Sequence, residues 1–319
     1  MAAVPIDHRF VSANGIRHHI AEQGAGPLVL MLHGWPESWY SWRHQLGPVA
    51  EAGFHAVAPD LRGYGQTDAP AEIDRYTMRE MVADAVGLLD ALGAKDAVVV
   101  GHDWGAVIAW HCAMLHPERF RAVAGLSVPF PSRPPVKPTA AFEGLFQGGF
   151  FYILYFQPPG VAEAELEADP RRSLRLVYYA ASGDAPKPTG FFGKPAGAKL
   201  LDGMIDPPQF PSWLSEEDLG VYAADFAKVG FRGGLNRYRN MDRDWEDLAH
   251  LADAKLEMPA LFIVGSKDLG LVQRPDAIDR MRKHVTNLEA VVVPGEGHWI
   301  QQEAPAETNE ALLGFLRRL

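Results

Sequence analysis

Apolar residues recur with two periods through residues 1–127, and these periods predict strands that alternate with helices. Short apolar runs predict buried strands at residues 28–32, 54–58, 97–100 and 121–126. Helical spacing of apolar residues predicts helices at residues 37–50, 77–92 and 104–115. A hairpin is expected about the Asn14-Gly15 turn that precedes them. The alternation is typical of a mostly parallel sheet with helices on both faces.

The helix at residues 77–92 has the sharpest pattern. Its apolar positions 78, 81, 82, 85, 89 and 92 fall on one helical face. Thr77 and Glu80 have the spacing of a capping box at the start of this helix, and Gly93 stands where a glycine ends a helix.

The pattern changes after residue 129. The segment from Pro129 to Pro138 contains five prolines, both ends included, and the next hundred or so residues are aromatic, helical or irregular. Alternation then resumes with strands at 261–264 and 290–293, a helix near 275–285 and a closing helix from about 304. We therefore predict an α/β core at residues 1–129, a mainly helical cap domain at 130–246, and the rest of the core at 247–319.

Composition and charge exclude several classes of function. The chain has 40 acidic residues against 30 Lys plus Arg, a formal net charge of -10, which disfavours nucleic acid as a partner. Neither a secretory signal nor an apolar run long enough to span a membrane is evident, so a cytoplasmic protein without membrane contact is expected. The single Cys112 lies in an apolar stretch and is expected to be buried. Metal-ligand spacings are absent, and neither a metal nor an organic cofactor is expected.

The ends of the predicted strands carry the candidate chemistry, because parallel sheets place ligands beyond the carboxyl ends of their strands. Residues 101–105 read G-H-D-W-G directly after an apolar run. This pattern resembles the nucleophile elbow of the α/β-hydrolases, with Asp103 at the nucleophile position and Gly105 as one of the small residues that permit the turn. The backbone N–H of Trp104 and that of Trp35, in the earlier H-G-W-P turn, are the expected oxyanion-hole donors.

The two partners of such a nucleophile follow it in the order acid, then histidine. Asp268 comes after the predicted strand at 261–264, and His298 comes after the one at 290–293. His298 is the expected general base and Asp268 the acid that orients it, although an aspartate there also suits a helix cap. The residues expected to shape the two turns are His33, Gly34, Pro36, His102 and Gly105.

A carboxylate nucleophile selects the class of substrate. An aspartate that attacks an sp³ carbon forms an alkyl ester, which activated water then hydrolyses. Epoxides and alkyl halides are therefore the candidate substrates. An epoxide leaves as a basic alkoxide and needs a proton donor such as tyrosine. From composition alone the donors stay open among six cap tyrosines: Tyr152, Tyr155, Tyr178, Tyr179, Tyr222 and Tyr238.

Several segments spread along the chain resemble the soluble epoxide hydrolase family of the α/β-hydrolase superfamily. They are H-G-W-P-E-S-W-Y-S-W-R at 33–43, D-L-R-G-Y-G at 60–65, G-H-D-W-G-A at 101–106, Y-F-Q-P-P-G-V-A-E-A-E-L at 155–166, G-F-R-G-G-L-N-R-Y-R-N at 230–240 and G-H-W at 297–299. The resemblance implies that Tyr152 and Tyr238 are the tyrosines that hydrogen-bond the epoxide oxygen. It also implies that Trp35 stands where haloalkane dehalogenases have asparagine, which favours epoxides. Arg237 departs from the tryptophan that is frequent in relatives.

The sequence thus predicts an enzyme that hydrolyses small hydrophobic epoxides to diols with water, as a monomer or homodimer. Two alternatives remain. A haloalkane dehalogenase uses the same nucleophile, and a ligand receptor uses the pocket without turnover.

Overall fold

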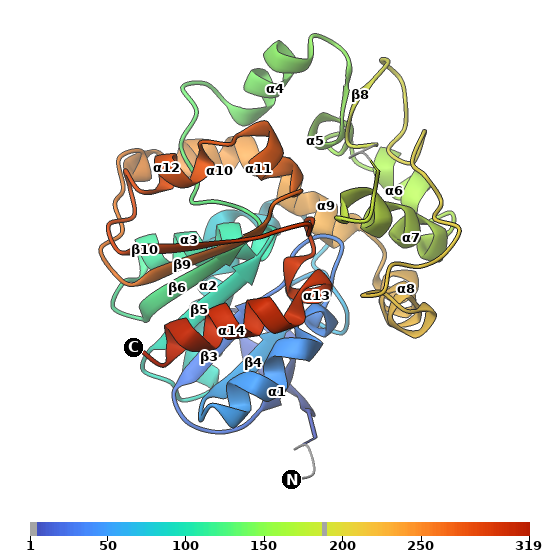
Figure 1. Cartoon of the computed structure of the whole chain (residues 1–319). Coiled ribbons are helices and arrows are strands. Elements are labelled where there is room, and N and C mark those ends of the chain that lie inside the picture. The colour runs from blue at the N-terminus through green and yellow to red at the C-terminus, as the bar shows by residue number, and fades with distance from the viewer. Residues whose placement is uncertain (1–4, 187–189) are drawn as a thin grey trace.

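An eight-stranded sheet forms the centre of the protein in a computed structural model that describes residues 5–186 and 190–319 (Figure 1). The strand order is β1-β2-β4-β3-β5-β6-β9-β10. The pairs β1–β2 and β2–β4 are antiparallel, and every other pair is parallel. The strands are β1 (Asp7–Ala13), β2 (Ile16–Gln23), β3 (Leu28–Leu32), β4 (His55–Pro59), β5 (Ala97–His102), β6 (Phe120–Leu126), β9 (Ala260–Gly265) and β10 (Leu288–Val293).

Helices cover both faces of this sheet. Successive side chains of each strand point to opposite faces, and the apolar side chains on each face pack against the helices there. On one face Val29 and Met31 of β3 belong to the core cluster that includes α1 (Arg43–Glu51) and α14 (Pro305–Leu316). On the other face Leu30 and Leu32 belong to the cluster that includes α2 (Met78–Ala91) and α3 (Trp104–Leu115). The predicted α/β architecture is confirmed.

A mainly helical insertion follows β6 and precedes β9, and it covers one end of the sheet (Figure 1). Its elements are α4 (Pro138–Phe146), β7 (Phe150–Phe151), α5 (Tyr152–Tyr155), α6 (Val161–Leu166), α7 (Pro170–Ala181), β8 (Phe192–Lys194), α8 (Glu216–Val229), α9 (Arg232–Arg239), α10 (Met241–Asp247) and the short turn η3 (Ala249–Leu251). The predicted boundary at 246/247 falls inside α10. The exact limits of the cap domain stay a prediction.

Two local predictions agree closely with the structure. Asn14 and Gly15 both have positive φ, 45° and 74°, as the tight turn of the β1–β2 hairpin requires. Helix α2 begins after Thr77, whose hydroxyl accepts the Glu80 N–H at 3.3 Å, and Gly93 follows its end with φ of 69°. In a capping box the Glu80 carboxylate would accept the Thr77 N–H. Here that carboxylate instead contacts Arg62 and Asn14.

Two helix predictions needed correction. The helix predicted at 37–50 begins later, as η1 (Trp39–Trp42) followed by α1, because Glu37 and Trp39 donate their N–H groups to Gly34 O and Asp60 Oδ1. The helix predicted near 275–285 is α12 (Ala277–Met281), and α11 (Leu269–Gln273) was not predicted. The closing segment is split into α13 (Ile300–Glu303) and α14, and the turn η2 (Ile73–Tyr76) precedes α2. Within the described ranges, the longest helices fall short of what crossing a membrane demands in length and apolar character.

Candidate active site

Asp103 lies on a strained turn between the end of β5 and the start of α3. Its φ of 52° and ψ of -119° are unusual for a residue with a side chain. The turn is permitted by the glycines on either side. A Cβ on Gly101 would lie 2.0 Å from Gly105 O, and a Cβ on Gly105 would lie 2.0 Å from Leu32 O. The predicted elbow is therefore present, and it raises the carboxylate above the end of the sheet.

The H-G-W-P turn that follows β3 lies directly against this carboxylate. A Cβ on Gly34 would lie 2.3 Å from the Asp103 Cβ, so only glycine allows the approach. The Trp35 N–H donates to Asp103 Oδ1 at 2.8 Å. Among the described residues no hydrogen bond joins the Trp104 N–H to this carboxylate, although Trp104 directly follows it as the first residue of α3.

Hydrogen bonds of the turn's other residues fix its shape. His33 Nε2 accepts the Leu61 N–H at 3.0 Å, so His33 Nδ1 carries the proton and donates to Gly34 O at 2.9 Å. The carbonyl of Pro36, which follows a cis peptide bond, accepts the hydroxyl of Tyr178 from the cap. These contacts suit the turn-shaping roles expected for His33, Gly34 and Pro36.

The two predicted partners of Asp103 meet it at the same end of the sheet. His298 Nε2 lies 3.4 Å from Asp103 Oδ2, and His298 Nδ1 lies 2.7 Å from Asp268 Oδ2. Asp268 is buried, and its second oxygen Oδ1 accepts the N–H groups of Gly270 and Leu271 at the start of α11. Asp268 therefore does both things expected of it: Oδ1 caps α11, and Oδ2 contacts His298.

The charges of this cluster are strongly coupled. Burial opposes the charge of His298, but its hydrogen bonds and charge interactions with Asp103 and Asp268 raise its pKa well above the ordinary value. Burial also opposes ionisation of Asp103, but His298, His102 and the Trp35 N–H lower its pKa below the ordinary value. Both shifts favour a protonated His298 beside an ionised Asp103.

Two tyrosines of the cap face this cluster. The rings of Tyr152, at the start of α5, and Tyr238, in α9, lie 5.9 Å apart, and the Tyr238 ring lies 5.1 Å from that of Trp104. Burial raises the pKa of both tyrosines, and the negative charge of Asp103 raises the pKa further. Tyr238 packs against the rings of Trp35 and Trp104, which belong to the two turns at Asp103, and Tyr152 packs against Tyr238.

The remaining cap tyrosines use their hydroxyls elsewhere. Tyr155, which competed with Tyr152 on composition, donates its hydroxyl to Glu165 Oε2 at 2.8 Å. The hydroxyls of Tyr178, Tyr179 and Tyr222 donate to Pro36 O, Asp184 O and Gln302 Oε1. Tyr152 and Tyr238 are the two candidates for which no acceptor is found among the described residues, and the Tyr238 hydroxyl accepts a hydrogen bond from the Trp104 side chain, which leaves its own proton to donate.

A buried carboxylate that the sequence analysis did not single out connects several of these segments. Glu37 Oε2 accepts the Gly34 N–H at 2.9 Å and lies 2.8 Å from His102 Nδ1. His102 Nε2 in turn lies 2.7 Å from the carbonyl oxygen of His298, which also accepts the Ser127 hydroxyl at 2.6 Å. His102 therefore links the elbow to the loop of His298. The adjacency of Glu37 to the H-G-W-P turn was the only signal in the sequence.

Arg237 replaces an aromatic residue expected from the resemblance and is buried behind the site. Its guanidinium lies over the Trp104 ring, 4.8 Å from the ring centre, donates to Tyr76 O and pairs with Asp244. Burial lowers the pKa of Arg237 to about 9. It therefore supports the wall formed by Trp104 rather than facing solvent.

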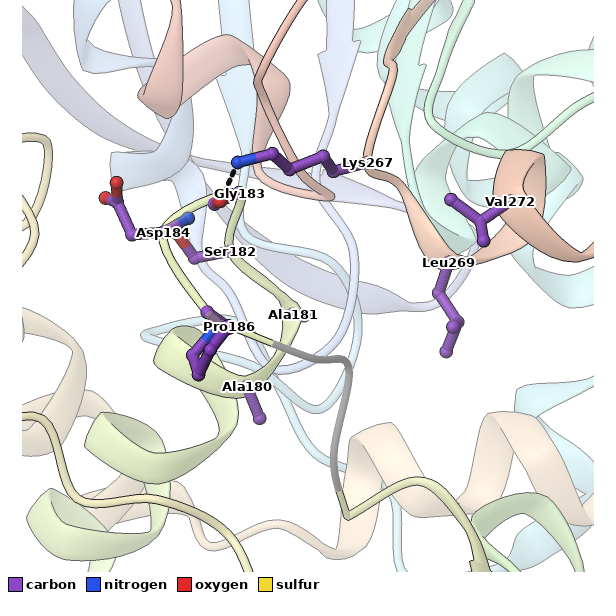
Figure 2. Close-up of a pocket in the computed structure, with 10 residues that line it drawn as sticks. Ala180, Ala181, Ser182, Gly183, Asp184, Pro186, Lys267, Leu269 and Val272 are labelled. Carbon is purple, nitrogen blue, oxygen red and sulfur yellow. Dashed lines mark hydrogen bonds between the residues drawn. The ribbon is translucent and has the colours of Figure 1, made fainter.

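A cavity of about 440 Å³ lies beside the site, between the end of α7 and the loop that follows β9. Lys267, Leu269 and Val272 line one side of it and residues 180–186 the other, as Figure 2 shows. Its lining includes Lys267 and Leu269, the two neighbours of Asp268 in the chain. No group of three or more His, Cys, Asp or Glu side chains in the described ranges has an arrangement that fits a metal ion.

Fold and site together define a hydrolase with a carboxylate at the nucleophile elbow. The family model described as "alpha/beta hydrolase fold" matches residues 27–180. Epoxide hydrolase A of Mycobacterium tuberculosis is 45% identical over 324 residues, which cover 98% of this chain and 97% of that protein. The chain therefore belongs to the epoxide hydrolase family of the α/β-hydrolase superfamily.

Solved structures agree with this assignment. The crystal structure of epoxide hydrolase A from Mycobacterium thermoresistibile matches with a TM-score of 0.93 and 45% identity, covering 98% of both chains. An epoxide hydrolase from an endophytic Streptomyces matches with a TM-score of 0.94 and 47% identity, covering 98% of this chain and 95% of that one. The similarity includes the cap as well as the core.

Proposed function

We propose that this epoxide hydrolase converts its substrates to vicinal diols through a covalent ester on Asp103. The observation that carries the proposal is the surroundings of the two carboxylate oxygens: Oδ1 accepts the Trp35 N–H at 2.8 Å, whereas Oδ2 lies 3.4 Å from His298 Nε2. Oδ2 is therefore the oxygen that attacks, and Oδ1 becomes the carbonyl oxygen of the ester.

Ring opening is the first step. Asp103 Oδ2 bonds to a ring carbon, the bond from that carbon to the epoxide oxygen breaks, and Tyr152 or Tyr238 gives that oxygen a proton. The charge of Asp103 raises the pKa of both tyrosines in the resting enzyme. As the ester forms this charge disappears, so the tyrosines become stronger acids when the alkoxide needs a proton.

Ester hydrolysis is the second step. Loss of the Asp103 charge also removes one of the two carboxylates that raise the pKa of His298, so the imidazolium releases its proton to solvent and becomes able to act as a base. His298 takes a proton from water, and the oxygen of this water bonds to the Asp103 Cγ. The Trp35 and Trp104 N–H groups stabilise the oxyanion at Oδ1.

Collapse of the intermediate completes the cycle. The bond between Cγ and the alkyl oxygen breaks, and the leaving oxygen takes the proton from His298 to give the diol. Asp103 returns as a carboxylate, its carboxyl proton restores the tyrosine, and His298 regains its resting proton from solvent. Asp268 keeps the imidazole oriented throughout through the 2.7 Å contact with Nδ1.

One turnover in oxygen-18 water tests this scheme. We expect one heavy oxygen in the peptide that contains Asp103, and an unlabelled diol from the first turnover. Heavy oxygen in the diol of that turnover would mean direct attack by water and would contradict the covalent route.

The wall of the site supports a small hydrophobic epoxide as substrate, because the reacting groups are surrounded by the rings of Trp35, Trp104 and Phe156. The cap limits 130–246, the cytoplasmic location and the state as monomer or homodimer stay predictions. Cell fractionation measures the location, and sedimentation velocity measures the oligomeric state.

A further inference from the structure

Glu303, the last residue of α13, holds the peptide on both sides of His298. Its Oε2 accepts the Gly297 N–H at 2.9 Å, and its Oε1 accepts the Trp299 N–H at 2.8 Å. The contacts of the Glu303 carboxylate are with backbone and with Ser182, and the imidazole ring itself is held by Asp103 and Asp268. Any influence of Glu303 on His298 therefore passes through the position of the backbone.

The same carboxylate also binds the cap. Glu303 Oε2 accepts the Gly183 N–H at 2.7 Å and lies 3.5 Å from the Ser182 hydroxyl, just after α7. One side chain thus joins two segments that are more than a hundred positions apart in the sequence.

Backbone contacts between these two segments are unusually close. The His298 N–H donates to Ala181 O at 2.9 Å. A Cβ on Gly297 would lie 2.3 Å from Gly183 N, and a Cβ on Gly183 would lie 2.4 Å from Gly295 O. The end of α7 therefore forms one wall of the loop that carries the base.

A second connection lies on the other side of the cap segment. Lys267, next to Asp268, donates from Nζ to Gly183 O at 2.6 Å, and Figure 2 shows this bond. Burial raises the pKa of Glu303 to about 7, against the opposing effect of the three backbone N–H groups. A carboxylate kept in surroundings that oppose its ionisation is consistent with a dedicated role there.

We propose that Glu303 is a positioning residue for ester hydrolysis, which holds the loop of His298 against the cap so that Nε2 stays in line with the Asp103 Cγ and the attacking water. This inference rests on the roles proposed above for Asp103 and His298. Glu303 then acts in hydrolysis of the ester and not in the attack of Asp103 on the epoxide.

The separation of steps has a physical reason. Attack by Asp103 on the epoxide needs the carboxylate and the tyrosines but no base. Hydrolysis needs His298 at hydrogen-bond distance from a water molecule, and displacement of a catalytic group by about 1 Å lowers a rate by roughly 100-fold. Loosening the loop of His298 should therefore slow hydrolysis and spare alkylation.

Glu303→Gln tests the proposal, because an amide presents one acceptor oxygen and turns an NH₂ group towards at least one of the backbone N–H groups. Single turnovers with styrene oxide are quenched at short times, and the ester on the enzyme is measured by intact mass. We expect alkylation within about twofold of the wild type and hydrolysis slower by roughly 10- to 100-fold, so that the ester accumulates.

Two further variants serve as controls for this result. Glu310→Gln makes the same chemical change at an exposed carboxylate of α14 that forms none of these hydrogen bonds, and both rates should be unchanged. His298→Gln should accumulate the ester completely. If His298→Gln forms no ester, the covalent mechanism itself is wrong. If it does and Glu303→Gln hydrolyses the ester at the wild-type rate, only the role of Glu303 is wrong.

A purely structural role of Glu303 would slow both steps together and lower the melting temperature, and that outcome would also overturn the proposal. Should Glu303→Gln fail to fold, Glu303→Asp keeps the charge and shortens the side chain by one methylene. The same selective slowing of hydrolysis is expected for it, and equal slowing of both steps would contradict the inference.

Discussion

At the scale of single residues, the charge of Asp103 acts on the tyrosines and on His298, the groups to which the proposed mechanism gives the acid and base roles. In the resting enzyme it raises the pKa of the tyrosines and that of His298. In the proposed mechanism ester formation removes this charge, and the pKa values of the acid and the base then change in the directions that the next step requires. On that mechanism one residue sets the order of the reaction.

The two cap tyrosines should affect ring opening only. In Tyr152→Phe and in Tyr238→Phe we expect alkylation to slow by about 100-fold, because each variant loses a proton donor, while hydrolysis of preformed ester stays near the wild-type rate. Single-turnover quenching measures both. Tyr155→Phe is the matched control, since its hydroxyl is bound to Glu165. A loss of alkylation in Tyr155→Phe equal to that in Tyr152→Phe would contradict the assignment.

The two steps should also differ in their dependence on pH. Asp103 has a lowered pKa and the tyrosines a raised one, so alkylation should be flat between about pH 5 and pH 9. Hydrolysis needs neutral His298, so its rate should rise with pH and level off once the esterified enzyme has lost that proton. Its midpoint should lie below that of His298 in the free enzyme, measured by NMR. Equal midpoints would show that the Asp103 charge does not control the base.

At the scale of elements, local signals predicted an element well where its ends are capped by its own neighbours. Helix α2 begins and ends within a residue of the prediction because Thr77 and Gly93 act locally. The start of α1 was predicted too early because Asp60, which is distant in the sequence, accepts the N–H of Trp39 in the preceding turn. Tertiary partners shift an element boundary that propensity alone would place elsewhere.

The cap of α2 makes a stability prediction. Thr77→Ala should lower the free energy of unfolding by about 1 kcal/mol, a fall in melting temperature of about 2 °C, because the Glu80 N–H loses its acceptor. Calorimetry measures the shift, and activity should not change. Thr77→Ser keeps the oxygen and should remain close to the wild type. If Thr77→Ser is destabilised as much as Thr77→Ala, the lost methyl group and not the cap is responsible.

At the scale of the whole molecule, the cap and the core complete one site between them. The sheet brings together the loops of Trp35, Asp103, Asp268 and His298 at one end, and the insertion brings Tyr152 and Tyr238 over that end. Arg43 of α1 joins the two parts, since it donates to Trp213 O, pairs with Asp218 and donates to Gln302. Arg43 is therefore one of the polar links between the cap and the core, together with contacts such as that of Tyr178 with Pro36 O.

Arg43→Met should loosen this connection. We expect the free energy of unfolding to fall by about 2 kcal/mol, because hydrogen bonds to a charged group are lost, and protease to cleave the cap faster. Melting curves and limited proteolysis measure the two effects. Lys228→Met removes a charge from an exposed position of α8 and should change neither. Equal proteolysis of Arg43→Met and the wild type would show that the cap does not depend on Arg43.

The sequence by itself determined the alternating α/β core, the elbow and the class of reaction, because apolar periods, glycine spacing and the order of acid and histidine are local or ordered along the chain. Composition left the tyrosine pair open and the spacing gave no sign of Glu303. Only the tertiary structure decided that Tyr155 turns towards Glu165 and that Glu303 joins Gly183 to the loop of His298. The physical reason is that these contacts depend on how the cap and the core pack together, which no local spacing in the chain records.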